Sequence, residues 1–203
     1  MIFPLWYAIL FGVSIISFII VIIICIQLYP KYSILTRTIS GLGNQEKRSA
    51  KLFNFTIAIM GFIMIPFPYY LFQVLLMRPI TYIGIGIFFC NPIGLILLGI
   101  FPENKEKPHL VAAGLGMGGS LLANLILLYP ILLSTLSIIL VVITIIMLIF
   151  CVPLTISAIK NVRSYEPDKK VEKIIFNLNF WEWIQFIVLQ IWIFALYVNL
   201  IFI

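Results

Sequence analysis

Charged residues are scarce in this sequence. They make up 10% of the 203 residues, whereas about 25% is usual in a soluble domain, and hydrophobic residues make up 63%. A compact fold of this length could not hide so much apolar surface from water. The composition therefore excludes a water-soluble globule, and it equally excludes a disordered chain or a collagen-like one.

Histidine, aspartate and cysteine are scarce as well. The chain has one histidine (His109), one aspartate (Asp168) and three cysteines. A typical metal centre draws on several histidine, cysteine or carboxylate ligands, so we expect no metal and no other cofactor. Cys25, Cys90 and Cys151 all fall inside apolar runs, which does not suggest a disulfide framework.

Long uncharged runs divide the chain, and a membrane-spanning helix needs about 20 apolar residues. Four of the runs are one helix long, but the run at residues 110–159 is too long for one span and must fold back. We place its turn at Tyr129-Pro130, because proline cannot donate the interior helix bond. The sequence predicts an all-α, polytopic transmembrane bundle of six helices in a single domain over residues 1–203. The predicted helices cover about 4–29, 52–77, 80–101, 110–129, 131–157 and 180–202.

Basic residues gather in alternate loops. The loops predicted at 30–51, 102–109 and 158–179 hold twelve of the thirteen lysines and arginines, and Arg78 is the exception. The positive-inside rule places these loops in the cytoplasm. We therefore expect a multi-pass cell-membrane protein with both termini outside. This asymmetry explains the net charge of +6 without a nucleic-acid partner.

A glycine-rich segment resembles a nucleotide-binding motif. Gly114-Leu115-Gly116-Met117-Gly118-Gly119 matches the spacing GxGxxG, which requires a preceding strand and a following acidic residue. Here the glycines lie inside an apolar span, so close helix packing is the better interpretation. We expect Gly114, Gly116, Gly118 and Ser120 to form a packing face, which could also receive another membrane subunit.

Prolines and amides interrupt the predicted spans. Pro66 and Pro68 break the second predicted helix near its middle, and Asn91-Pro92 lies at the middle of the third. An amide at that depth must find a hydrogen-bond partner. Interhelical hydrogen bonding and a role in ligand binding or conduction both remain open for these groups.

Three segments together resemble a known family. They are Thr38-Ile39-Ser40-Gly41-Leu42-Gly43, then Leu52-Phe53-Asn54 with Gly61, and Gly99-Ile100-Phe101-Pro102-Glu103 followed by His109. Over about residues 5–157 the chain resembles the prokaryotic integral membrane family named domain of unknown function 998. That family is similar in turn to the eukaryotic DRAM/FRAG/Sfk-like membrane proteins. The resemblance implies a six-helix bundle and no established activity. The eukaryotic relatives are associated with lipid handling, which only loosely suggests a function.

Basic and polar residues of the first and third loops form the candidate binding site. If these loops meet, Ser40, Glu103 and His109 share one polar pocket at headgroup level, with a lipid phosphate as the expected occupant. The alternative is that the loops merely cap the bundle. The predicted headgroup-binding residues are Arg37, Ser40, Lys47, Arg48 and His109.

Two functions from different classes fit these features. The first is a non-enzymatic protein that interacts with membrane lipids or serves as an accessory subunit of a membrane complex. The second is a membrane enzyme acting on a lipid headgroup, with His109 as acid/base and Ser40 and Glu103 as further catalytic candidates. The enzyme requires His109 within hydrogen-bond reach of Ser40 or a carboxylate.

Overall fold

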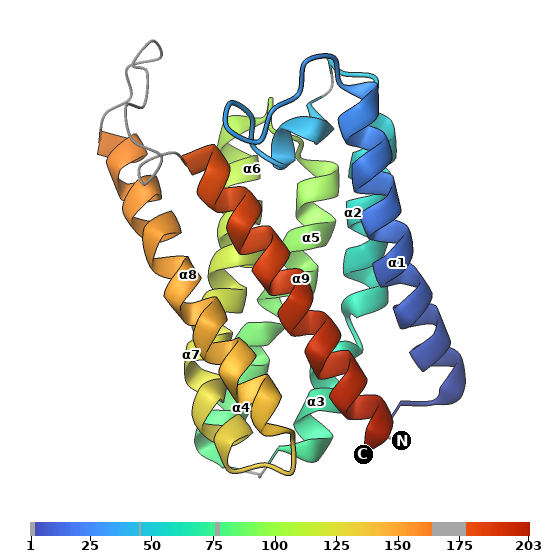
Figure 1. The fold of residues 1–203 in the computed structure, drawn as a ribbon, viewed down its shortest axis with the longest axis vertical. Helices are drawn as coiled ribbons and strands as arrows, with labels where there is room; N and C mark the ends of the chain where they lie inside the picture. Colours follow the sequence, from blue (N-terminus) through green and yellow to red (C-terminus); the bar gives the residue numbers. More distant parts are fainter. Residues whose placement is uncertain (1–2, 45, 76–77, 164–177) are drawn as a thin grey trace.

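The protein folds as an elongated bundle of helices. Its structure, a computed structural model, describes residues 3–44, 46–75, 78–163 and 178–203. Figure 1 shows the two termini at the same end of the bundle. Within the described residues, six helical stretches are long and apolar enough to cross a membrane. This confirms the prediction of an all-α bundle of six helices.

The first three spans contain two breaks. Pro66 separates α2 from α3, as predicted, because proline removes a backbone donor from the helix interior. The third span is interrupted at Phe89, and Pro92 then lies in the first turn of the next helix, where its missing N–H is not needed. The elements are α1 (Leu5–Leu28), the 3₁₀ turn η1 (Ser40–Gly43), α2 (Ala50–Met64), α3 (Phe67–Val74), α4 (Pro79–Phe88) and α5 (Cys90–Ile100).

The last three spans begin with a helix that contains a π-helical segment. The fourth span is α6 (Glu106–Ala113), the π-helical η2 (Gly114–Gly118) and α7 (Gly119–Leu132). The fifth and sixth are α8 (Ile138–Arg163) and α9 (Leu178–Phe202). The loop predicted at 158–179 is therefore shorter, since α8 reaches Arg163, and residues 164–177 lie outside the described residues.

The predicted turn at Tyr129-Pro130 is wrong. Helix α7 continues through Pro130 to Leu132, and the chain turns over residues 133–137. A proline near a helix end removes only one backbone bond, which the helix tolerates. The turn instead follows Ser134, whose hydroxyl donates to the Ile131 carbonyl at 2.7 Å and accepts from the Leu136 N–H at 3.2 Å.

Glycines let the helices approach closely, as is usual in membrane bundles. Gly61 of α2 lies against the backbone of α5 at the Pro92 carbonyl. Gly99 of α5 lies against the backbone of α2 at the Asn54 carbonyl. These reciprocal contacts fix α2 along α5 at both ends of their shared length.

Aromatic rings fill the end of the bundle that holds the termini. Phe11 stacks on Phe67 with ring centroids 4.7 Å apart, and Phe3 packs edge-on against Tyr70 at 5.0 Å. Tyr197 of α9 donates to the Ala8 carbonyl at 2.8 Å, which ties the last span to the first. These contacts hold α1, α3 and α9 together at this end.

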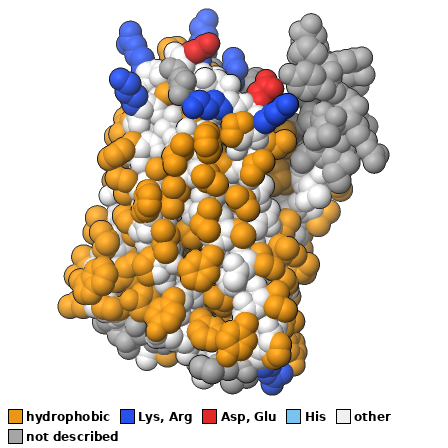
Figure 2. Space-filling model, turned by 180° about the vertical axis from the view of Figure 1, so that it is seen from behind, with side chains coloured by type: hydrophobic (Ala, Val, Ile, Leu, Met, Phe, Trp, Pro, Cys, Tyr) orange, Lys and Arg blue, Asp and Glu red, His pale blue; other side chains and the backbone are white. Residues whose placement is uncertain are grey.

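Basic side chains lie mainly at the end of the bundle opposite the termini (Figure 2). Figure 2 shows most of the lysine and arginine side chains on this face at one end, together with acidic ones and above a broad apolar band, with a further basic side chain at the other end. The loop that carries η1 lies at the end opposite the termini in Figure 1. The band presents many exposed large hydrophobic side chains, which is the surface expected of helices that face hydrocarbon.

Candidate functional site

A cavity of about 590 Å³ lies between the helices, at the end that carries the basic loops. Its size is within the roughly 300–1,000 Å³ of known ligand pockets. Residues of α2, α5, α6, η2 and α9 form its walls, and Phe18 of α1 and Leu154 of α8 add to them. The space is lined by residues from all six spans, and α3, α4 and α7 contribute none. It is partly open to the surroundings, since the lining residues Glu106, Leu110, Gly114 and Gly118 are exposed.

The cavity is long in the direction of the helices. On α9 its lining residues recur at helical spacing, from Leu178 through Glu182, Phe186 and Gln190 to Ile193. Glu182 and Ile193 are eleven positions apart, which corresponds to about 16 Å at 1.5 Å per residue. The stretch from Glu182 at the rim to Ile193 is therefore about half of the ~30 Å hydrocarbon thickness of a bilayer, or one leaflet. With Leu178 included, the lining on α9 extends over about 22 Å.

Carboxylates dominate the polar rim of the cavity. Glu103, Glu106 and Glu182 all line it, and the described lining residues include no lysine or arginine. The Thr38 hydroxyl donates to Glu103 Oε1 at 2.6 Å, and the Ser40 N–H donates to Glu182 Oε1 at 3.4 Å. The first and third loops thus meet, and the first loop also contacts the start of α9.

The half-buried Tyr32 and the buried Trp183 hold the first loop on the rim. The Tyr32 hydroxyl donates to the Thr38 carbonyl at 2.6 Å and accepts from Trp183 Nε1 at 2.9 Å. Burial raises the pKa of the Tyr32 phenol above its ordinary value, so the hydroxyl keeps the proton that it donates. Because Trp183 follows Glu182 on α9, this bond also fixes the carboxylate beside the loop.

His109 lies on the first turns of α6, not in the loop predicted at 102–109. The helix begins at Glu106, whose negative charge in the first turn suits the helix dipole. His109 Nδ1 lies 2.8 Å from the Phe101 carbonyl and must donate to it, because a carbonyl only accepts. In the described part of the chain, no hydrogen bond joins His109 to Ser40 or Glu103, although all three residues line the cavity.

Two amides lie deep in the cavity with an oxygen that has no partner. Asn91 is 1% exposed, and its Nδ2 donates to the Gly116 carbonyl at 3.0 Å and to the Ser120 hydroxyl. Among the described residues nothing donates to Asn91 Oδ1 or to Gln190 Oε1. Asn124 Oδ1, which lies outside the cavity, likewise has no partner among the described residues. Because buried polar atoms are normally satisfied by protein, water or ligand, a donor group beside Asn91 or Gln190 would complete their hydrogen bonds.

The glycine-rich segment forms a wall of the cavity and only partly a packing face. Gly116 packs against Gly94 of α5, as its predicted role requires. A Cβ on Gly114 or on Gly118 would meet nothing within 4 Å, and both residues line the cavity. The structure therefore departs from the expected packing by Gly114 and Gly118, because this side of η2 faces open space instead of a helix.

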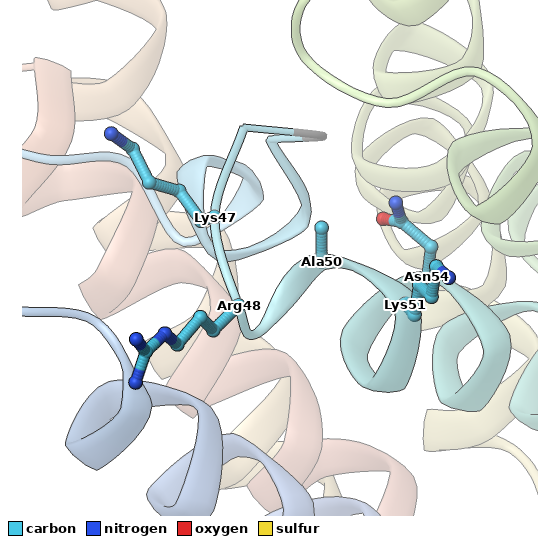
Figure 3. A pocket seen from close by; sticks show the side chains of 5 residues that line it. All are labelled: Lys47, Arg48, Ala50, Lys51 and Asn54. Carbon is cyan, nitrogen blue, oxygen red and sulfur yellow. The ribbon is translucent and has the colours of Figure 1, made fainter.

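The predicted basic residues lie apart from this cavity. Lys47, Arg48 and Lys51 line a separate hollow of about 500 Å³, which shares only Asn54 with the cavity. Figure 3 shows Lys47 and Arg48 extending to one side, away from Asn54 on α2. Arg37 is exposed and lines neither space. The structure thus separates the residues that were expected to bind a lipid headgroup. Ser40 and His109 line the cavity, whereas the basic residues lie outside it.

The comparisons with known proteins give one match. The model of the family described as "Protein of unknown function (DUF998)" matches residues 13–199. The chain belongs to this family. That result confirms the family predicted from the three motifs. No curated protein and no solved structure matches the chain.

The motifs that carried the family resemblance converge on the cavity. Ser40 from the first, Asn54 from the second, and Glu103 with His109 from the third all line it. Sequence reasoning missed Glu106 and Glu182 as site residues. A signal for Glu182 was present, because this carboxylate stands between Trp181 and Trp183 at the start of an otherwise uncharged run.

Proposed function

We propose that this protein binds one membrane amphiphile, with the apolar chain between the helices and the headgroup at the rim. The single observation that carries this proposal is the shape and lining of the cavity. A polar rim leads into a space of one-leaflet length whose walls include Ile57, Leu95 and Leu189. An amphiphile has the same order of polar and apolar parts along its length.

The basic end of the bundle supports a further, weaker contact with lipid. Lys47, Arg48 and Arg37 lie on loops at this end, where anionic headgroups attract positive charge. Under this proposal the basic end faces the cytoplasm of the cell membrane, and both termini face outward. These surface residues hold the protein in its membrane, while the cavity selects the bound molecule.

The alternative functions have less support. An enzyme with His109 as acid/base needs a nucleophile or carboxylate in contact with the ring, and the hydrogen bond of His109 Nδ1 goes to the Phe101 carbonyl. An accessory subunit that docks through the glycine-rich helix would have to cover Gly114 and Gly118, which are exposed but line the cavity, while Gly116 is buried against Gly94. Binding is therefore the function that we propose.

Native mass spectrometry of the purified protein tests the proposal. We expect one amphiphile per chain that survives collisional activation strong enough to strip detergent and loosely held lipid. Extraction of the same sample should yield one enriched class of molecule. A bare chain, or a ladder of weakly held adducts with the composition of the bulk membrane, would contradict a specific cavity ligand.

A further inference from the structure

The polar groups of the cavity that lack a partner are hydrogen-bond acceptors. Asn91 Oδ1 and Gln190 Oε1 are unpartnered amide oxygens. The Asn91 side chain is 1% exposed, and its donor hydrogens are already used by Gly116 and Ser120. A ligand that satisfies these oxygens must bring its own N–H or O–H groups into the cavity.

The charge of the rim points to the same kind of ligand. Three of the four glutamates in the described residues line this one cavity, and the fourth, Glu46, is exposed elsewhere. Within the described residues, the hydrogen bonds that Glu103 and Glu182 accept come from the neutral donors Thr38 and Ser40, not from a cation. Two neighbouring carboxyl groups beside an apolar space relieve their repulsion by holding a proton or by pairing with a cation, and an ammonium group between them supplies that cation.

From these two observations we propose that the cavity is specific for a long-chain amine or an aminolipid without a phosphate group. This proposal rests on the proposed function. The ammonium group lies between Glu103 and Glu182 at the rim. Donor groups farther along the molecule reach Gln190 and Asn91. A lipid phosphate, the occupant expected from the sequence, would meet negative charge instead of the basic residues that bind it.

The experiment compares three probes with the same chain on the full-length protein. Hexadecylamine, hexadecanol and hexadecanoic acid are titrated against delipidated protein in one uncharged detergent, and binding is followed by native mass spectrometry. We expect the amine to bind at least tenfold more tightly than the alcohol, and the acid to bind most weakly. The variants Glu103→Gln and Glu182→Gln should each reduce the preference for amine over alcohol to threefold or less.

Glu46→Gln is the matched control, because it removes one exposed carboxylate away from the cavity and should leave the amine preference unchanged. Glutamine at 103 still accepts from Thr38, so the loop keeps its contact. Tighter binding of the acid, equal binding of all three probes, or an equal response to Glu46→Gln overturns the amine preference while cavity binding stands. If none of the three probes binds, both proposals fail.

Discussion

Replacing Gly94 with alanine is expected to destabilise the protein severely. A Cβ at this position would run into the backbone of Gly116, where α5 meets η2. Backbone atoms cannot turn aside as a flexible side chain can, so the two helices must separate. Overpacking of this kind costs about 3 kcal/mol, and we expect the midpoint of thermal unfolding in detergent to fall by roughly 6–12 °C.

The partner glycine supplies the control for that variant. A Cβ on Gly116 would lie 3.7 Å or more from Gly94 and Leu98, which is ordinary van der Waals contact. Gly116→Ala should therefore stay within about 1 kcal/mol of the wild type, since it adds helix propensity and causes no clash. Equal unfolding midpoints for Gly94→Ala and the wild type would mean that α5 and η2 do not touch as described.

Replacing Gly118 with leucine is expected to remove the bound amphiphile without disturbing the fold. Gly118 lines the cavity, and a side chain added there enters open space. The new side chain occupies volume that the apolar chain of the ligand needs. We expect the retained amphiphile to fall at least tenfold in native mass spectrometry, with an unfolding midpoint close to that of the ligand-free wild type.

A second glycine allows the same substitution outside the cavity. Gly86 of α4 is exposed, does not line the cavity, and also has nothing within 4 Å of a Cβ. Gly86→Leu should retain the amphiphile at the wild-type level, and Gly114→Leu should behave like Gly118→Leu. Retention in the Gly118→Leu and Gly114→Leu proteins would show that the bound molecule lies somewhere else.

The six spans could be predicted because hydrocarbon excludes charge, so the uncharged runs mark the helices directly. The position of the turn in the longest run could not be predicted from Pro130. That proline lies near a helix end, and the turn depends on a hydrogen bond from Ser134 to the Ile131 carbonyl. Proline marks a possible break, whereas the local hydrogen bonds decide whether the chain turns.

The site was only partly predictable. Ser40, Glu103 and His109 could be grouped because their loops lie at the same end of the bundle, and the structure brings all three to one cavity. The roles of Gly114 and Gly118 could not be predicted from the sequence, because the same glycine spacing is compatible with a helix contact and with a cavity wall. The rotation of η2 about its own axis decides between the two, and that depends on contacts with Gly94 and Asn91.

The most direct test of the account is a density map of the protein in a lipid bilayer disc. We predict continuous elongated density inside the cavity, with its polar end between Glu103 and Glu182 and its other end near Asn91. A cavity that holds only water, or one closed by movement of α9 against α5, would contradict the central claim that these helices enclose an amphiphile.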